Sequence, residues 1–159
     1  DRCILWFLEE MGAHVILTPQ GVQIQKGDLK AIHADVASCP DLMPVLSVLM
    51  ANARGVSEIT GGKRLRLKES DRIRAMAENL SAMGVRVEER DQGLKIWGAK
   101  SIRGGAVQGY NDHRIVMAMA TAACNSKAPI LITDHQAVDK SYPDFFGDLK
   151  SMGGEWNVI

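Results

Sequence analysis

The chain has 159 residues, of which 46% are hydrophobic and 24% charged, a composition typical of a globular domain and not of a disordered segment. Its formal net charge is zero, so no overall field attracts nucleic acid or an anionic membrane, and any anion binding must be local. Three widely spaced cysteines favour a reducing cytoplasm, and the apolar run from Ile4 to Leu8 is too short for a signal peptide or a membrane span.

The first 28 residues predict a helix followed by two strands. Residues 2–11 carry apolar side chains at helical spacing, and Gly12 is a typical stop after a helix. Residues 14–17 and 22–25 are predicted as the two strands of a hairpin. Because residue 1 is Asp and the pattern starts in the middle of a repeat, we expect the chain to be a fragment.

The same layout returns 72 residues later. Residues 71–83 predict an amphipathic helix, Gly84 ends it, and strands are predicted at 85–89 and 94–97. A third copy of the helix end is visible at residues 148–153, 69 residues further on. The chain is therefore built from repeats of one unit.

The other half of the unit also repeats. A strand at 31–36, a helix opened by Pro40-Asp41 and a strand at 56–60 are matched by a strand at 102–108, a helix opened by Asn111-Asp112 and a strand at 129–133. The predicted fold class is α/β, with βαβαββ units in a pseudo-threefold arrangement, helices packed inside and sheets outside. We expect 1–28 to be the tail of one unit, 29–98 a complete unit, and 99–159 most of a further unit.

Residues 64–72 form a charged segment directly before a predicted helix. Only Leu65 and Leu67 could enter a core, so we expect a strand-like lead-in that ends at Ser70 or Asp71 as the helix N-cap. A helix N-terminus attracts anions, and the neighbouring lysine and arginine strengthen this preference. The alternative is a solvated charged turn with a good cap.

Repeat symmetry predicts one charged site. Closure of the repeats brings four cations and three carboxylates to one end of the domain: Lys68, Arg72, Arg114 and Lys140, with Asp41, Glu69 and Asp112. Arginine binds carboxylate or phosphate bidentately and lysine acts as a point charge, so this cluster suits a ligand with both groups. Carboxylates held among cations can differ in pKa, as acid–base chemistry requires.

These residues also have structural explanations. Asp41 and Asp112 can be simple N-caps, and His113 with Arg114 can be a capped surface pair. We expect no metal site, because no histidine has partners at metal-ligand spacing. The remaining charged and turn positions are expected to be solvated or structural: Arg64, Arg66 and Arg74 at the surface, and Tyr142-Pro143 at the start of the last helix.

Four ordered motifs resemble the 5-enolpyruvylshikimate-3-phosphate synthase family over nearly the whole chain. They are Pro40-Asp41 at a helix start, Lys68-Glu69-Ser70-Asp71-Arg72, Asn111-Asp112-His113-Arg114, and Lys140-Ser141-Tyr142-Pro143-Asp144-Phe145-Phe146. The resemblance implies the C-terminal portion of an enzyme with two domains of three βαβαββ units each. It also implies transfer of the enolpyruvyl group of phosphoenolpyruvate to the 5-hydroxyl of shikimate 3-phosphate, with release of phosphate and without metal or organic cofactor.

The resemblance implies roles for the charged residues. Asp41 would contact shikimate 3-phosphate and accept the proton of the attacking hydroxyl, Lys68 would help to bind this substrate, and Glu69 would transfer a proton at the methylene carbon. The expected phosphoenolpyruvate ligands are Arg72, Arg114 and Lys140, with Asp112 and His113 in support. Arg64 departs from the Asn that some members use to contact the substrate.

The expected partners are the two small-molecule substrates and an N-terminal domain of the same cytoplasmic, monomeric enzyme, with no nucleic acid or membrane partner. We expect the isolated chain to be inactive, because that domain carries the other half of the site. Two alternatives remain. One is the related UDP-N-acetylglucosamine enolpyruvyl transferase, which shares the repeat fold, and the other is a non-catalytic fragment that binds anions.

Overall fold

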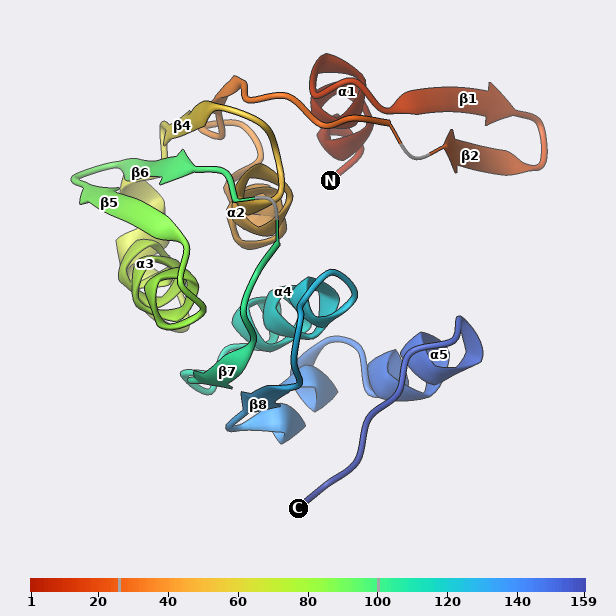
Figure 1. Cartoon of the computed structure of the whole chain (residues 1–159), viewed down its shortest axis with the longest axis vertical. Coiled ribbons are helices and arrows are strands. Elements are labelled where there is room, and N and C mark those ends of the chain that lie inside the picture. The colour runs from red at the N-terminus through yellow and green to blue at the C-terminus, as the bar shows by residue number, and fades with distance from the viewer. Residues whose placement is uncertain (26, 100) are drawn as a thin grey trace.

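The computed structural model describes residues 1–25, 27–99 and 101–159. Its α-helices are α1 (Cys3–Glu10), α2 (Met43–Ala51), α3 (Arg72–Ala82), α4 (His113–Ala123) and α5 (Phe145–Ser151), and its 3-10 helices are η1 (Pro40–Leu42), η2 (Lys63–Leu67) and η3 (His135–Lys140) (Figure 1). The strands are β1 (His14–Thr18), β2 (Gly21–Gln25), β3 (His33–Asp35), β4 (Val56–Thr60), β5 (Arg86–Arg90), β6 (Gly93–Trp97), β7 (Gly105–Val107) and β8 (Ile130–Ile132).

The middle of the chain forms a four-stranded sheet in the order β3-β4-β6-β5. Strands β3 and β4 are parallel and joined through η1 and α2, whereas β6 runs antiparallel to both β4 and β5. Helix α3 connects β4 to the β5–β6 hairpin. This is the βαβαββ order predicted from the sequence.

The flanking segments repeat parts of this sheet in register. In the hairpin β1–β2, Thr18 pairs with Gly21, and 72 residues later Arg90 pairs with Gly93 in β5–β6. The parallel pair β7–β8 repeats β3–β4 with the same offset, since Gly105 pairs with Ile130 as His33 pairs with Glu58. The predicted fold of repeated units is confirmed at the level of individual residue pairs.

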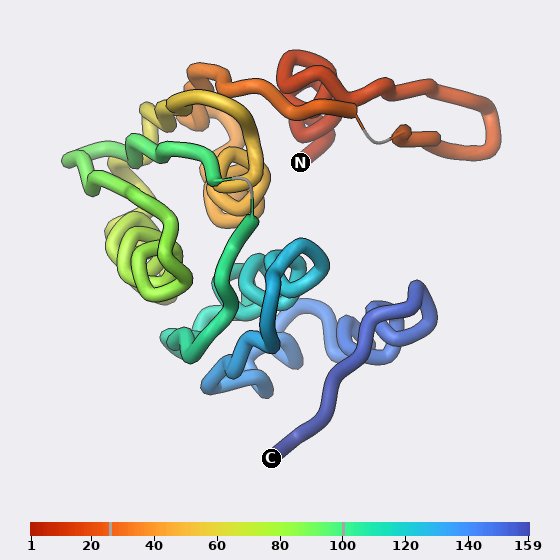
Figure 2. Tube along the Cα trace, viewed as in Figure 1, coloured from red at the N-terminus to blue at the C-terminus, as the bar shows by residue number. Residues whose placement is uncertain are grey.

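Helices α2, α3 and α4 pack against one another, with the sheets outside them (Figure 1). Helix α2 is apolar on most sides, and its Met43, Leu46 and Met50 have no exposed surface. The helical core therefore holds the first turns of α3 and α4 close together, while the β1–β2 hairpin extends away from this body (Figure 2).

The charged segment before α3 is predicted from the sequence to be strand-like. This prediction is wrong, because the segment contains the 3-10 helix η2. Leu65 has no exposed surface, whereas Leu67 is 88% exposed. With three residues per turn, residues two apart point to different sides of a 3-10 helix, so only one of the two leucines can enter the core. Asp71 is the N-cap of α3 and accepts a 3.1 Å hydrogen bond from the backbone amide of Arg74.

The last helix begins later than predicted. Tyr142 and Pro143 lie in a turn before α5, whose first residue is Phe145. The amide of Phe145 donates to the carbonyl of Tyr142 at 3.1 Å, which closes this turn. Pro143 therefore shapes the approach to the helix and does not occupy its first position.

Candidate functional site

The candidate site is centred on Arg72, the first residue of α3, whose side chain is 1% exposed. Its Nη1 donates to Asp41 Oδ1 at 2.7 Å, and its Nη2 donates to Glu69 Oε2 at 2.7 Å. Its Nε and Nη2 donate to the two carboxylate oxygens of Asp112 at 2.8 and 3.1 Å. Burial alone would lower the pKa of Arg72, but Asp112, Glu69 and Asp41 raise it above its ordinary value. The guanidinium therefore stays charged in the interior.

Asp112 is the most buried carboxylate of the cluster, with no exposed surface. It is the N-cap of α4 and accepts from the amide of Arg114 at 2.9 Å, as the simpler sequence reading proposed. It also accepts from the hydroxyl of Ser70 at 2.9 Å and from Arg72. Burial would raise the pKa of Asp112, but the hydrogen bonds and charge of Arg72 lower it, with help from Ser70. It serves as cap and as counter-ion at once.

Asp41 does not cap a helix, because Cys39 and Leu42 occupy the N-cap positions of η1 and α2. Its carboxylate instead faces three cations. The nearest contacts are 2.7 Å to Arg72 Nη1, 3.2 Å to Lys68 Nζ and 3.9 Å to Arg114 Nη2. Burial would raise the pKa of Asp41, but these three cations, Lys68 foremost, lower it. The lowered pKa keeps the carboxylate ionised, and because 33% of its side chain is exposed, a ligand can contact it.

Six of the predicted residues thus form one continuous network at the start of α3 and α4: Asp41, Lys68, Glu69, Arg72, Asp112 and Arg114. Glu69 is the most open carboxylate of the network, with 42% of its side chain exposed. Lys140 lies at the end of η3 and donates to the carbonyl of Asn111, next to Asp112. The Nδ1 atom of His113 is buried and has no hydrogen-bond partner among the described residues.

Two left-handed residues shape the loop that presents Asp112. Tyr110 and Asn111 have φ angles of 52° and 49°, in a backbone region that residues other than glycine rarely adopt. The hydroxyl of Tyr110 is bound to Glu78 of α3, and the amide of Asn111 donates to Asp134 at 3.3 Å. These contacts fix the turn that points Asp112 at Arg72.

Arg66, expected to be solvated, is a structural residue. Its guanidinium donates to Asp71 at 2.8 Å and to Glu89 at 2.9 Å. It also donates to the backbone carbonyls of Asp91 at 2.9 Å and Arg90 at 2.7 Å, which lie at the tip of the β5–β6 hairpin. The charged segment is thereby tied to the sheet. Every residue has a backbone carbonyl, so the sequence does not show which of these groups accept hydrogen bonds from Arg66. Arg64 is exposed, as predicted.

The arrangement can bind an anion and move protons. Lys68 and Arg114 are 31% and 29% exposed, so both cations can reach a ligand beside the ionised Asp41.

No set of three or more metal-binding side chains is gathered within residues 1–25, 27–99 and 101–159. No helix in the same ranges combines the length and apolar character needed to span a bilayer.

Two curated relatives are similar to this chain in sequence over nearly its whole length. A 3-phosphoshikimate 1-carboxyvinyltransferase of Clostridium novyi is 40% identical over 161 residues, and that of Thermococcus kodakarensis is 47% identical over 152 residues. These matches cover 99% and 96% of the chain but 37% and 38% of the relatives. The chain therefore spans less than two-fifths of the length of these relatives.

Solved structures agree with these matches. An EPSP synthase of Acinetobacter baumannii superposes with a TM-score of 0.84 at 30% identity, covering 95% of this chain and 38% of that one. The enolpyruvyl transferase NikO of Streptomyces tendae shares the fold, with a TM-score of 0.80 at 22% identity over 97% of this chain and 35% of that one. The family described as EPSP synthase (3-phosphoshikimate 1-carboxyvinyltransferase) matches residues 1–149. With its fold and its ordered charged motifs, the chain belongs to the EPSP synthase family.

Proposed function

We propose that this chain is part of the C-terminal domain of a cytoplasmic enzyme that transfers the enolpyruvyl group of phosphoenolpyruvate to the 5-hydroxyl of shikimate 3-phosphate. The observation that carries the proposal is the network in which Asp41, Glu69 and Asp112 surround Arg72, with Lys68 and Arg114 beside them. The substrates carry phosphate and carboxylate groups, which these cations can bind. The proposal involves neither metal nor organic cofactor.

Asp41 is the proposed base. Its lowered pKa keeps it ionised at neutral pH, and its exposed side is open to a substrate hydroxyl. As the hydroxyl oxygen bonds to the central carbon of phosphoenolpyruvate, Asp41 accepts its proton while the methylene carbon gains one. Loss of phosphate and of one methyl proton from the adduct then restores the double bond. Lys68, whose Nζ lies 3.2 Å from Asp41 Oδ1, is the proposed ligand of shikimate 3-phosphate at the same point.

Glu69 is the proposed group for proton transfer at the methylene carbon, and Arg114 and Lys140 are the proposed phosphoenolpyruvate ligands. Arg72 is also proposed as a ligand, although each of its nitrogens already donates to a carboxylate. We therefore propose that the phosphoenolpyruvate carboxylate replaces Glu69 on Nη2 of Arg72. Glu69 is the most exposed of the three partners, so this bond is the easiest to exchange.

A chimera provides the test, because the chain alone is expected to lack the other domain and to release no phosphate. The matching segment of the Thermococcus kodakarensis relative is replaced by this chain, and phosphate release from phosphoenolpyruvate and shikimate 3-phosphate is measured. In this chimera Asp41→Asn should lower kcat by about 10²–10⁴-fold, the usual contribution of a positioned base. Arg114→Ala should mainly raise the KM for phosphoenolpyruvate.

The matched control is Arg74→Ala, since Arg74 is 68% exposed and lies outside the network. It should leave both constants unchanged. An active chimera in which Asp41→Asn keeps its kcat would overturn the assignment of the base. If UDP-N-acetylglucosamine replaces shikimate 3-phosphate as acceptor, the related transferase activity is the correct one. An inactive chimera that still binds phosphate at the network would instead favour a non-catalytic anion-binding role.

A further inference from the structure

The β7–α4 loop, residues 108–112, carries two of the contacts that assemble the candidate site. Asp112 binds Arg72, and the carbonyl of Asn111 accepts a hydrogen bond from Lys140. Two consecutive residues of this loop lie in the left-handed region, a conformation that costs free energy and persists only where surrounding contacts hold it. The contacts of the loop with its neighbours therefore decide where these site residues meet.

One of these contacts is a pair of hydrogen bonds from Asn79, in the second half of α3. Its Nδ2 donates to the carbonyl of Gln108 at 2.8 Å, and its Oδ1 accepts from the amide of Gln108 at 2.9 Å. Asn79 is 2% exposed, and a buried amide is stable only when its donor and its acceptor are both paired. Because both bonds go to one residue, they fix the orientation of the backbone at the start of the loop as well as its position.

Asn79 lies seven residues after Arg72, which places the two side chains on the same face of α3. Arg72 binds the last residue of the β7–α4 loop, and Asn79 binds the first. Of the buried residues that the structure describes in α3, these two are the polar ones, and the others are apolar. An apolar contact alone allows packed elements to shift slightly, whereas two polar contacts at opposite ends of the loop select one alignment.

The preceding copy of the repeat shows that the fold itself does not require an amide at this position. There, 72 residues earlier, the counterpart of Asn79 is Phe7, which is 1% exposed. The loop of that copy takes a different course, since Cys39, the counterpart of Asn111, has a φ of −141°. The buried amide therefore accompanies the left-handed loop.

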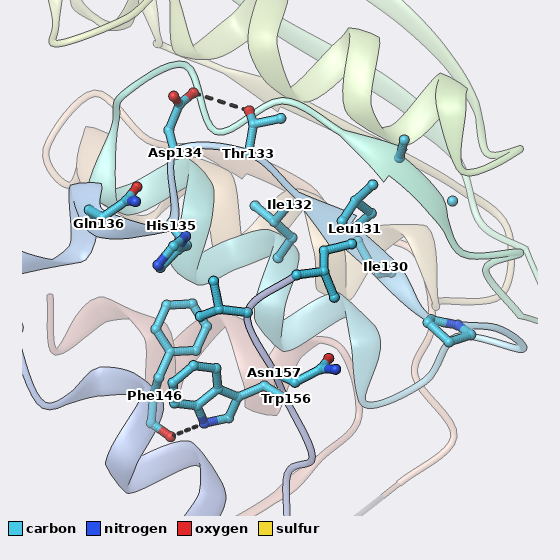
Figure 3. Close-up of a pocket in the computed structure, with 15 residues that line it drawn as sticks. Ile130, Leu131, Ile132, Thr133, Asp134, His135, Gln136, Phe146, Trp156 and Asn157 are labelled. Carbon is cyan, nitrogen blue, oxygen red and sulfur yellow. Dashed lines mark hydrogen bonds between the residues drawn. The ribbon is translucent and has the colours of Figure 1, made fainter.

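Thr133 and Asp134, directly after β8, give the loop a second set of contacts (Figure 3). The hydroxyl of Thr133 accepts from the amide of Gly109 at 3.0 Å and donates to Asp134 at 3.1 Å, the dashed line at the top of Figure 3. Asp134 in turn accepts from the amide of Asn111. The bonds to Asp134 lie at exposed positions, where water can replace either partner.

Tyr110 supplies a third contact, beside Asn79. Its hydroxyl is bound to Glu78, and burial, with a further contribution from Glu78, raises the pKa of Tyr110 to about 12, so the hydroxyl keeps its proton and donates. Glu78 is 46% exposed, so this contact is also open to water. Asn79 is therefore the contact of the loop that is best shielded from solvent.

We propose that Asn79 is a positioning residue, which fixes the β7–α4 loop so that Asp112 meets Arg72. The same bonds hold in place the carbonyl that binds Lys140. Asn79 itself is buried and contacts no substrate in the proposed reaction. Its effect on turnover rests on the proposed function, in which Arg72 and Lys140 bind phosphoenolpyruvate.

The β7–α4 loop does not carry the groups proposed for shikimate 3-phosphate. Asp41 belongs to η1, and Lys68 follows η2. Loosening the loop should therefore weaken the binding of phosphoenolpyruvate and leave that of shikimate 3-phosphate unchanged. A general loss of stability would not separate the two substrates in this way.

The test uses the chimera described above, with the KM of each substrate measured separately. Asn79→Leu keeps the branched shape of the side chain and removes both hydrogen bonds. It should raise the KM for phosphoenolpyruvate by about tenfold, the effect of two lost hydrogen bonds, and leave the KM for shikimate 3-phosphate unchanged. The matched control is Leu94→Ala in β6, which removes buried apolar volume and none of the hydrogen bonds of the loop. It should lower stability and leave both KM values unchanged.

Amide hydrogen exchange, followed by mass spectrometry, measures the loop without turnover. Exchange in peptides that cover residues 108–112 should be faster in Asn79→Leu and unchanged in Leu94→Ala. A native chimera that releases no phosphate but still shows this difference would refute the proposed enzymatic function and support the role of Asn79 in the loop.

Three results would overturn the proposal: unchanged exchange of the loop in Asn79→Leu, an equal rise of both KM values, or a selective rise in Leu94→Ala. If Asn79→Leu does not fold, Asn79→Asp carries the same test, because it keeps the acceptor for the Gln108 amide and loses the donor to the carbonyl. If neither variant folds, Asn79 is required for the fold as a whole, and the positioning role is wrong.

Discussion

Replacing Arg72 by Met tests whether one guanidinium holds the buried charges of the site together. Methionine retains apolar volume in the pocket but carries no charge. It leaves Asp112, which has no exposed surface, without the partner that compensates its burial. The hydrogen bonds from Ser70 and from the amide of Arg114 remain, but neither supplies a positive charge. The variant therefore creates an uncompensated carboxylate in the interior.

The expected loss comes almost entirely from Asp112. Asp41 and Glu69 are 33% and 42% exposed, so water can solvate them when Arg72 is removed, and their contribution is small. Breaking a buried pair on one side costs about 3–5 kcal/mol. For a domain of this size each kcal/mol lowers the melting temperature by about 2–4 °C, so the variant should melt roughly 6–20 °C below the native chain.

The pH dependence of this loss has a definite sign. In the native chain the pKa of Asp112 is lowered, so the pair contributes stability above the unfolded pKa and loses it as the pH falls through the folded pKa. In the Arg72→Met variant, burial without a cation raises the pKa of Asp112 above its unfolded value, so the folded state takes up the proton first. The difference in unfolding free energy between the two chains should therefore shrink as the pH falls.

Urea unfolding followed by circular dichroism at several pH values measures this difference. The control is Arg74→Met, which changes an arginine that is 68% exposed and should shift stability by no more than about 0.5 kcal/mol. Adding Asp112→Asn to Arg72→Met should recover part of the loss, because Asn is neutral and still caps α4. A loss as small as that of Arg74→Met, or one that does not change with pH, would refute the reasoning.

Two further predictions concern the segment that supports the site. Arg66→Ala should lower the unfolding free energy by about 1.5–3 kcal/mol, the usual effect of losing hydrogen bonds to charged groups. Arg64→Ala, at an exposed position, should be nearly neutral, and urea unfolding of the two variants compares them directly. Gly93→Ala should destabilise the fold by about 1–3 kcal/mol, because the added Cβ would lie 1.8 Å from the carbonyl oxygen of Ile59. A Cβ added at Gly147 would have no atom within 4 Å, so Gly147→Ala should leave the midpoint of thermal unfolding unchanged.

The repeat made most of the fold predictable from the sequence. Glycines end the helices of successive units in the left-handed region, with φ of 99° at Gly12 and 80° at Gly84, and the hairpins follow them at the same distance. Such stops are local, because they depend on the backbone freedom of one residue. The prediction of a strand-like segment before α3 is wrong. The alternation of Arg and Leu is also compatible with a 3-10 helix, which the contacts of Arg66 hold against the β5–β6 hairpin.

The site was predictable in composition but not in connectivity. Motif spacing and repeat symmetry named the charged residues, and six of them form one network. Nothing in the sequence indicated that Arg72 is buried or that Asp112 accepts from both Arg72 and Ser70. These contacts span about 40 residues and depend on how α3 and α4 pack. The roles of the individual residues in catalysis stay predictions until the chimera is measured.

The in-register repeat has a consequence for how genes of this kind change length. Recombination between the two copies at equivalent positions would remove or add 72 codons at once, for example between those of His33 and Gly105. The product would keep every strand in phase with its partner, because the residues on either side of the junction occupy the same place in the unit. A deletion of another length that falls within a strand would shift the strands against each other and expose their apolar faces. Whole units are therefore the steps by which such a scaffold can grow or shrink.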